Sequence, residues 1–169
     1  LAYQSYLRAE LCGPSPSGMR VTSHQLLPST DVIIAELHGE VISTLSLVRD
    51  GEGGLPIEAV YPHEVLTRRA RGLRLAEVSC LADRREGAAR FFGLFTELSR
   101  LMVQLADDEG IDELLIAVHP RHARMYRRAM GFTQVGENRD YPAVNDNPAV
   151  ALSLVLDDVR QRQPAIWQR

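Results

Sequence analysis

The amino-acid sequence predicts a mixed α/β fold, in which helices flank a central mixed β-sheet. Three patterns carry this prediction. Two apolar, β-branched runs at 32–37 and 41–48 enclose a turn, as in a β-hairpin. Apolar runs then alternate with helical repeats, as in βα units. Finally, the segment 91–105 is strongly amphipathic, which is typical of a long helix packed on a sheet.

Composition limits the classes of function. A chain of 169 residues suits one domain spanning 1–169. A net charge of −3 argues against a nucleic-acid partner, although every basic residue is arginine. Two cysteines make no disulfide framework, and no apolar stretch reaches the roughly 18 residues that cross a bilayer. We therefore expect a cytoplasmic protein without stable membrane insertion, whose start is truncated because the chain begins at Leu1.

The first elements follow from apolar spacing and from turn residues. Apolar residues on one face predict a helix over 1–11, which ends at the Gly/Pro/Ser-rich loop 13–18. In the hairpin, Gly39 is expected in the turn. A further helix is expected to begin at Pro62 and to end at Gly72.

The run 73–82 is predicted to be a central strand, because both of its faces are largely apolar. The predicted faces are Leu73, Leu75, Glu77, Ser79 and Leu81 on one side, and Arg74, Ala76, Val78, Cys80 and Ala82 on the other. The long helix follows and is expected to end at Gly110. The remaining predicted elements are a strand at 112–119, a helix at 121–130, strands at 132–136 and 149–156 joined by the polar loop 137–148, and a polar tail at 157–169.

A hexapeptide between the central strand and the long helix, Arg84-Arg85-Glu86-Gly87-Ala88-Ala89, resembles the pyrophosphate-binding loop of the GNAT acyltransferases. Glycine lets the backbone approach a phosphate, and a helix N-terminus offers free N–H donors. The element order also resembles the GNAT fold over nearly the whole chain. The resemblance implies that the donor is bound by Leu81, Arg84, Arg85, Gly87, Ala88, Ala89 and Arg124. The alternative interpretation of the hexapeptide is an ordinary capped helix start.

Several separate stretches resemble a narrower family, the FeeM-like N-acyl amino acid synthases, which are related to the acyl-homoserine lactone synthases. These stretches are 16–22, 55–58, 75–81, 119–123 and 141–145. The related autoinducer synthases often carry Glu-x-Ser-Arg on the central strand, whereas Cys80 stands at the basic position here. The resemblance implies acyl transfer to the amine of a small acceptor such as an amino acid. The donor would be acyl-carrier protein or acyl-CoA, a co-substrate and not a permanently bound cofactor.

Amide formation requires an unprotonated amine, a polarised thioester carbonyl and a route for the proton. Glu77 is the predicted general base, because burial on an apolar strand raises the pKa of a carboxyl. The alternative is a structural Glu77 paired with Arg74 or Arg139. Ser79 is expected to hydrogen-bond either the acceptor or a structural partner.

His119 and Tyr126 are the other candidate catalytic residues. His119 ends a predicted strand, where α/β sites tend to lie, and is expected to relay a proton or to cap the next helix. Acetyltransferases often place a general-acid tyrosine four residues before this glycine, whereas Tyr126 lies five before Gly131. One helical residue is a rotation of about 100°, which favours a core or pocket-wall role for Tyr126. The His119-x-x-His122 pair has no third ligand with suitable spacing, so no metal is predicted.

Several features keep two interpretations open. The arginine clusters Arg68, Arg69, Arg71, Arg74 and Arg121, Arg124, Arg127, Arg128 are either solvated faces or sites for an acidic partner or a phosphopantetheine phosphate. The apolar residues Leu55, Ile57, Val60 and Val65 line an acyl tunnel or belong to the core. The rival functions are an acetyl-CoA-dependent N-acetyltransferase and a non-catalytic GNAT-fold domain that binds a ligand or a partner.

Overall fold

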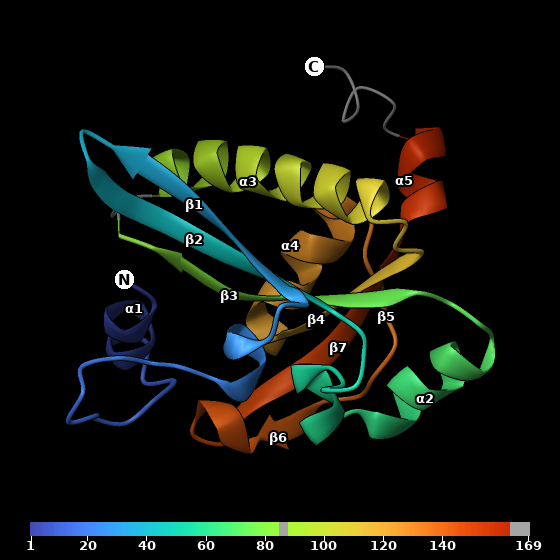
Figure 1. The fold of residues 1–169 in the computed structure, drawn as a ribbon, viewed down its shortest axis with the longest axis horizontal. Coiled ribbons are helices and arrows are strands. Elements are labelled where there is room, and N and C mark those ends of the chain that lie inside the picture. Colours follow the sequence, from blue (N-terminus) through green and yellow to red (C-terminus); the bar gives the residue numbers. More distant parts are fainter. Residues whose placement is uncertain (85–87, 163–169) are drawn as a thin grey trace.

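The computed structural model describes residues 1–84 and 88–162. These residues form a seven-stranded sheet with the order β1-β2-β3-β4-β7-β5, in which β6 also pairs with β7 (Figure 1). The strands are β1 (Thr30–Leu37), β2 (Glu40–Arg49), β3 (Leu75–Asp83), β4 (Glu113–Val118), β5 (Thr133–Gln134), β6 (Arg139–Tyr141) and β7 (Asn147–Val155). The β3–β4 pair is parallel and the other strand pairs among the described residues are antiparallel, so the prediction of a mixed sheet is confirmed.

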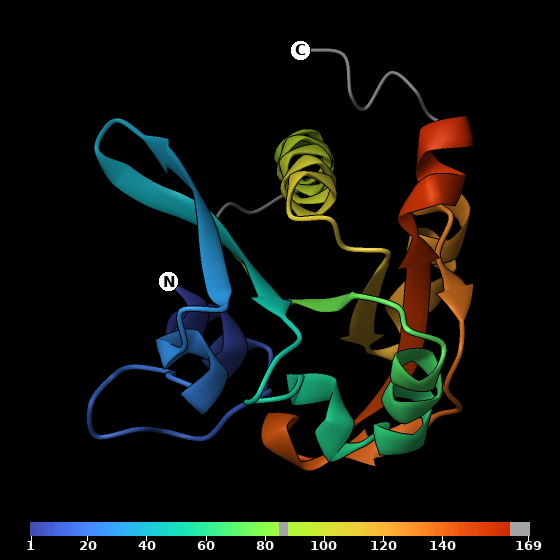
Figure 2. The same cartoon turned by 45° about the vertical axis from the view of Figure 1, so that its right-hand side comes forward.

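Helices cover both faces of the sheet. They are α1 (Ala2–Arg8), α2 (Pro62–Ala70), α3 (Ala88–Asp108), α4 (Pro120–Met130) and α5 (Leu156–Arg162). The views in Figures 1 and 2 place α3 and α5 on one side of the sheet and α1 and α2 on the other. The core is divided accordingly, with α3, α4 and α5 packed on one buried cluster and α2 on a second. Among the described residues, no helix is long and apolar enough to cross a membrane.

Local chemistry explains the predicted elements that the structure confirms. His38 and Gly39 have φ values of 53° and 81°, so both hairpin-turn residues adopt the left-handed conformation that matches strand twist. Gly131 ends α4 with φ 80°, where a residue without a side chain carries no steric penalty. Gly110, the expected end of α3, likewise has φ 69°.

Two predictions for the C-terminal third are wrong. The segment 137–148 is not a simple loop, because it contains β6 and a short 3₁₀ turn, Pro142–Val144. The expected polar tail begins with α5, in which Leu156 and Val159 are buried against the core. Residues 163–169 of that tail lie outside the described residues. Two apolar side chains in seven residues give too short a pattern to show helical periodicity.

Two of the four arginines in the first cluster, Arg68 and Arg69, are held by carboxylates of the fold. The Nε of Arg68 lies 2.8 Å from the carboxylate of Glu113, which is only 4% exposed. Arg69 binds the carboxylates of Asp50 and Glu58. These arginines therefore fasten α2 to the sheet and to the preceding loop.

The apolar residues before and within α2 belong to the core. Leu55, Ile57 and Val65 are buried in the cluster on the α2 side of the sheet, and Val60 packs against it. The core interpretation is therefore confirmed, and the acyl-tunnel interpretation for these residues is wrong.

Tyr61 joins the turn before α2 to the far side of the sheet. Its side chain is fully buried, and its hydroxyl donates to the Ala149 carbonyl oxygen at 2.6 Å, with the Glu137 carbonyl oxygen 2.9 Å away. A Cβ on Gly136 would stand 2.6 Å from the ring, so only glycine leaves room for this contact. The tyrosine thus ties together segments that are far apart in the sequence.

Replacing Tyr61 by phenylalanine removes the donor and leaves buried carbonyl oxygens without it. We expect Tyr61→Phe to lower the free energy of unfolding by about 1 to 3 kcal/mol, measured by urea denaturation. Tyr126→Phe is the matched control, since its hydroxyl makes no hydrogen bond within the described part of the chain. Equal losses in the two variants would contradict the hydrogen-bond explanation.

Candidate active site

A cavity opens where β3 and β4 part. Their parallel pairing covers only three positions and ends with Glu77 opposite Leu115. Beyond that point a cavity of about 550 Å³ lies between the strands, lined by residues 78–81 of β3 and 116–119 at the end of β4. The divergence of the two strands is visible in Figure 2. One strand pair therefore both anchors the sheet and frames a ligand-sized space.

A β-bulge shapes the β3 wall of this cavity. Cys80 has φ 54°, and the β2–β3 register shifts so that Cys80 and Leu81 together oppose one residue of β2. The predicted strict alternation after Ser79 is therefore wrong. Leu81 packs against the core cluster that contains α3, whereas the Cys80 sulfur lies 3.4 Å from the Gln25 side chain.

Glu77 lies at the point where the strands part. It is 3% exposed, and its Oε2 accepts a hydrogen bond from the Ile57 backbone N–H at 2.6 Å. Burial raises the pKa of Glu77 to about 8, against the opposing effect of that hydrogen bond. The alternative pairing with Arg74 or Arg139 is wrong, because these arginines bind Asp112 and Glu64 respectively.

Three side chains that the sequence analysis did not single out lie at the same end of the cavity: Tyr6, Arg20 and Tyr141. The Arg20 guanidinium lies 4.3 Å from the centroid of the Tyr6 ring. The Tyr141 hydroxyl donates to the Pro56 carbonyl oxygen at 3.0 Å. Burial, and then nearby acidic groups, raise the pKa of both phenols. Arg20 and Tyr141 do fall in two of the stretches that carry the family resemblance, which was the available signal.

Ser79 and His119 also line the cavity, from its two opposite strands. The His119 Nδ1 accepts a hydrogen bond from the Arg121 backbone N–H at 3.2 Å, so the side chain caps α4 as expected. His122 lies nearby, its ring centroid 6.3 Å from that of His119. The described residues include no group of three side chains suited to hold a metal ion.

Tyr126 belongs to the apolar part of the cavity. Its ring packs edge-to-face on Phe95 and Phe132, with centroid distances of 5.9 and 5.8 Å. Burial raises the pKa of Tyr126 to about 12, so the hydroxyl keeps its proton near neutral pH. The apolar lining around it comprises Leu45, Phe95, Met102, Val103, Leu114, Ile116, Met130, Phe132 and Leu154.

The residues proposed to bind the donor are dispersed. Leu81 lines the cavity, whereas Arg84, just after β3, is exposed and binds Glu40 at the start of the neighbouring β2 at 2.7 Å. Arg85 and Gly87 lie outside the described residues. Ala88 and Ala89 open α3 as expected, and their side chains also lie outside the described part.

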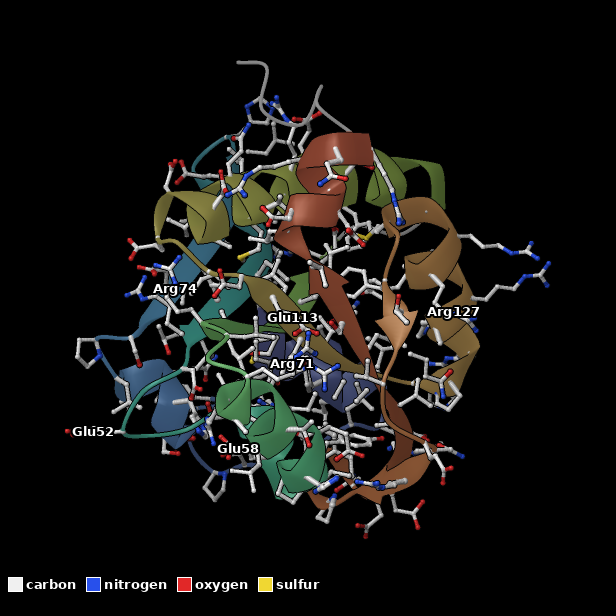
Figure 3. The ribbon with its side chains drawn as sticks, turned by 90° about the vertical axis from the view of Figure 1, so that its right-hand side faces the viewer. Glu52, Glu58, Arg71, Arg74, Glu113 and Arg127 are labelled. Carbon is white, nitrogen blue, oxygen red and sulfur yellow. The ribbon has the colours of Figure 1, made fainter. Side chains whose placement is uncertain are left out.

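Arg124 lines a second hollow and not the main cavity. This hollow, of about 600 Å³, is also lined by Arg127, Arg128 and Arg162, and it shares Phe132 with the main cavity. Figure 3 shows Arg127 on the outer side of α4. Within the described residues, Arg124, Arg127 and Arg128 form no ion pair with a carboxylate. The second arginine cluster therefore remains open to an anionic partner.

Comparisons with known proteins agree with this architecture. A search of curated protein sequences found no significant match. Among solved structures, the chain is similar to FeeM, an N-acyl amino acid synthase from uncultured soil microbes, with 25% identity, a TM-score of 0.79, and coverage of 95% of this chain and 90% of that one. The acyl-homoserine lactone synthase LasI gives 18% identity, a TM-score of 0.70 and coverage of 92% and 82%. The CoA-dependent acyl-homoserine lactone synthase MesI gives 17% identity, a TM-score of 0.65, and coverage of 95% of this chain and 82% of that one.

The sheet order and these likenesses identify the GNAT fold that the sequence predicted. The family model for the N-acyl amino acid synthase FeeM matches residues 1–155, which is most of the chain. The chain therefore belongs to the FeeM family of N-acyl amino acid synthases and is an N-acyltransferase.

Proposed function

We propose that the chain transfers a long acyl group from a phosphopantetheine thioester, on acyl-carrier protein or CoA, to the amine of an amino acid. One observation carries the proposal: a single cavity joins a polar end at Glu77 to an extended apolar part between α3, β4 and α4. Its volume of about 550 Å³ falls in the range of about 300 to 1,000 Å³ that is typical of small-molecule sites.

In this mechanism Glu77 is the general base. An amino acid is mostly an ammonium ion near neutral pH, so its nitrogen must lose a proton before or during attack. A carboxyl with a pKa of about 8 is matched to that task, since it holds an abstracted proton more strongly than an exposed carboxylate does. The Ile57 N–H fixes one carboxyl oxygen, which leaves the other available to the amine.

The acyl carbon is proposed to lie between the parted strands. The β3 edge beyond Glu77 has no ladder partner in β4, so its main-chain groups are available to polarise the thioester carbonyl. Ser79 is assigned a hydrogen bond to the acceptor. The ammonium form of the amine first loses one proton to solvent. The nitrogen then bonds to the acyl carbon, the carbon–sulfur bond breaks, and the second proton lost by the nitrogen passes to Glu77. Glu77 afterwards releases this proton to solvent, from which the group that protonates the thiolate regains its own proton.

The departing thiolate needs a proton. Tyr126 retains its hydroxyl proton and lines the cavity, so we assign it this second role beside its part in the apolar wall. His119 is assigned to positioning, because its Nδ1 is engaged in capping α4.

Mass spectrometry of lipid extracts provides the direct test of the activity. Cells that express the chain should accumulate long-chain N-acyl amino acids that an empty-vector control lacks. Glu77→Gln should lower this product about 100-fold or more, because it removes the base while keeping the shape. Glu97→Gln, on the exposed side of α3, should retain the product.

Two results would contradict parts of this proposal. If the purified protein acetylated amines from acetyl-CoA and made no long-chain product, it would be an N-acetyltransferase. If Glu77→Gln retained full activity, Glu77 would not be the base.

The raised pKa of Glu77 predicts opposite effects of pH on activity and on stability. Activity should increase with pH up to about 8, because only the ionised carboxyl accepts a proton. In the unfolded chain Glu77 ionises near the ordinary value of about 4.3, whereas in the folded protein it stays protonated until about 8. Wild-type protein should therefore lose stability relative to Glu77→Gln as pH rises between these values. Urea denaturation of both at pH 5 and pH 8 measures this, and a constant difference would contradict the raised pKa.

Arg124, Arg127 and Arg128 of α4, which bind no carboxylate among the described residues, favour acyl-carrier protein as the donor. Carrier proteins present acidic surfaces, and the N-terminal end of α4 lines the main cavity through Arg121 and His122. Replacing Arg124, Arg127 and Arg128 together by glutamine should increase KM for acyl-carrier protein about 10-fold or more and weaken its dependence on salt. KM for the matching acyl-CoA should change little. Equal increases for both donors would instead indicate that these arginines bind a phosphate common to the two.

A further inference from the structure

Arg20 is a cation in the lining of the cavity, and the described residues place no anion beside it. Its nearest contacts are the Tyr6 ring at 4.3 Å, the Ala143 carbonyl oxygen at 3.5 Å and the Cys80 sulfur at 3.9 Å. Within the described residues, no carboxylate lies in ion-pair distance of it. Other arginines of this chain behave differently: Arg49, Arg68, Arg69, Arg84 and Arg139 each bind a carboxylate.

This arrangement leaves most of the hydrogen-bonding capacity of Arg20 unused. A guanidinium has five N–H donors in a fixed fork, and the two polar contacts here are long. A partly buried charge without a partner is unfavourable, and a planar carboxylate matches the fork with two parallel hydrogen bonds. The side chain is therefore prepared for an anion that the described residues do not supply.

The position of Arg20 relative to Glu77 defines which anion is suitable. Arg20 and Glu77 line the same cavity, and the Arg20 guanidinium lies 3.9 Å from the sulfur of Cys80, three residues after Glu77 on β3. An α-amino acid carries its carboxylate and its amine on the same carbon. With the carboxylate bound at Arg20, we expect the amine on the same carbon to lie on the β3 side of the cavity, which carries Glu77.

We infer that Arg20 binds the carboxylate of the acceptor and restricts the enzyme to α-amino acids over simple amines. The inference rests on the proposed function, since it concerns the acceptor of that same reaction. The Tyr6 ring contacts one face of the Arg20 guanidinium through a cation–π interaction, and one guanidinium nitrogen faces the Ala143 carbonyl oxygen. The segment before β1 and the turn after β6 therefore build the acceptor site together.

Matched acceptor pairs test this assignment. Leucine, phenylalanine and tyrosine are compared with 3-methylbutylamine, 2-phenylethylamine and tyramine, which lack only the carboxylate, at saturating donor. Wild-type enzyme should prefer each amino acid. Arg20→Gln should increase KM for the amino acids about 10- to 100-fold and change KM for the amines and for the donor less than about 3-fold. Arg20→Lys should restore part of the loss, because it returns the charge without the fork.

Arg74→Gln is the matched control, since Arg74 is exposed and lies outside the cavity lining. It should leave all acceptor constants unchanged. If Arg20→Gln affected amines and amino acids equally, or increased KM for the donor alone, the carboxylate assignment would be overturned while acyl transfer itself stood.

A binding measurement separates this inference from the proposed function. If no donor gives turnover, titration calorimetry with N-dodecanoyl-phenylalanine and N-dodecanoyl-2-phenylethylamine still tests Arg20. Weaker binding of only the first compound to Arg20→Gln and, less so, to Arg20→Lys supports the inference. Equal affinities in wild-type protein, or no binding of either compound, overturn it. Thermal unfolding of each variant identifies any that fails to fold. If Arg20→Gln fails to fold, the same binding comparison with Arg20→Lys tests the inference.

Discussion

The short parallel pairing of β3 with β4 is the constraint on which the rest of the structure depends. After Glu77 the strand pairing seen among the described residues is with the outer neighbours: β3 pairs with β2, and β4 pairs with β7 along its whole length. The bulge at Cys80 re-aims the end of β3 while keeping it paired with β2. Because both strands remain anchored, the sheet opens without losing its core, and the cavity occupies the opening.

The buried carboxyl at that opening requires a rigid support. Its hydrogen-bond donor is the Ile57 N–H, in the short turn between β2 and α2. That turn is held by the ion pairs of Arg69 with Asp50 and Glu58, and α2 is held by Arg68 on buried Glu113. Removing one member of a buried ion pair leaves an uncompensated charge, so this network keeps the turn in place. The ion pairs of the scaffold thus hold the Ile57 N–H against Glu77, where it opposes the rise in pKa that burial of the carboxyl causes.

The cavity separates two kinds of chemistry within one space. Its apolar part is formed by α3, β4 and α4, where burial of a long acyl chain is favourable at about 0.8 kcal/mol for each CH₂ group. Its polar end gathers Glu77, Arg20 and two tyrosines from four separate segments. This division of the cavity matches the product of an N-acyl amino acid synthase, the family to which the chain belongs. An N-acyl amino acid joins an apolar acyl chain to a charged head group.

The sequence by itself determined the elements whose cause is local. The period of α3, the His38-Gly39 turn, the end of α4 at Gly131 and the place of Glu77 on a central strand could all be predicted from neighbouring residues. Only the tertiary structure decided the bulge at Cys80, the convergence of Arg20 on the cavity and the pairing of Arg84 with Glu40. These features depend on strand register and on contacts between residues far apart in the chain, which spacing and composition do not encode.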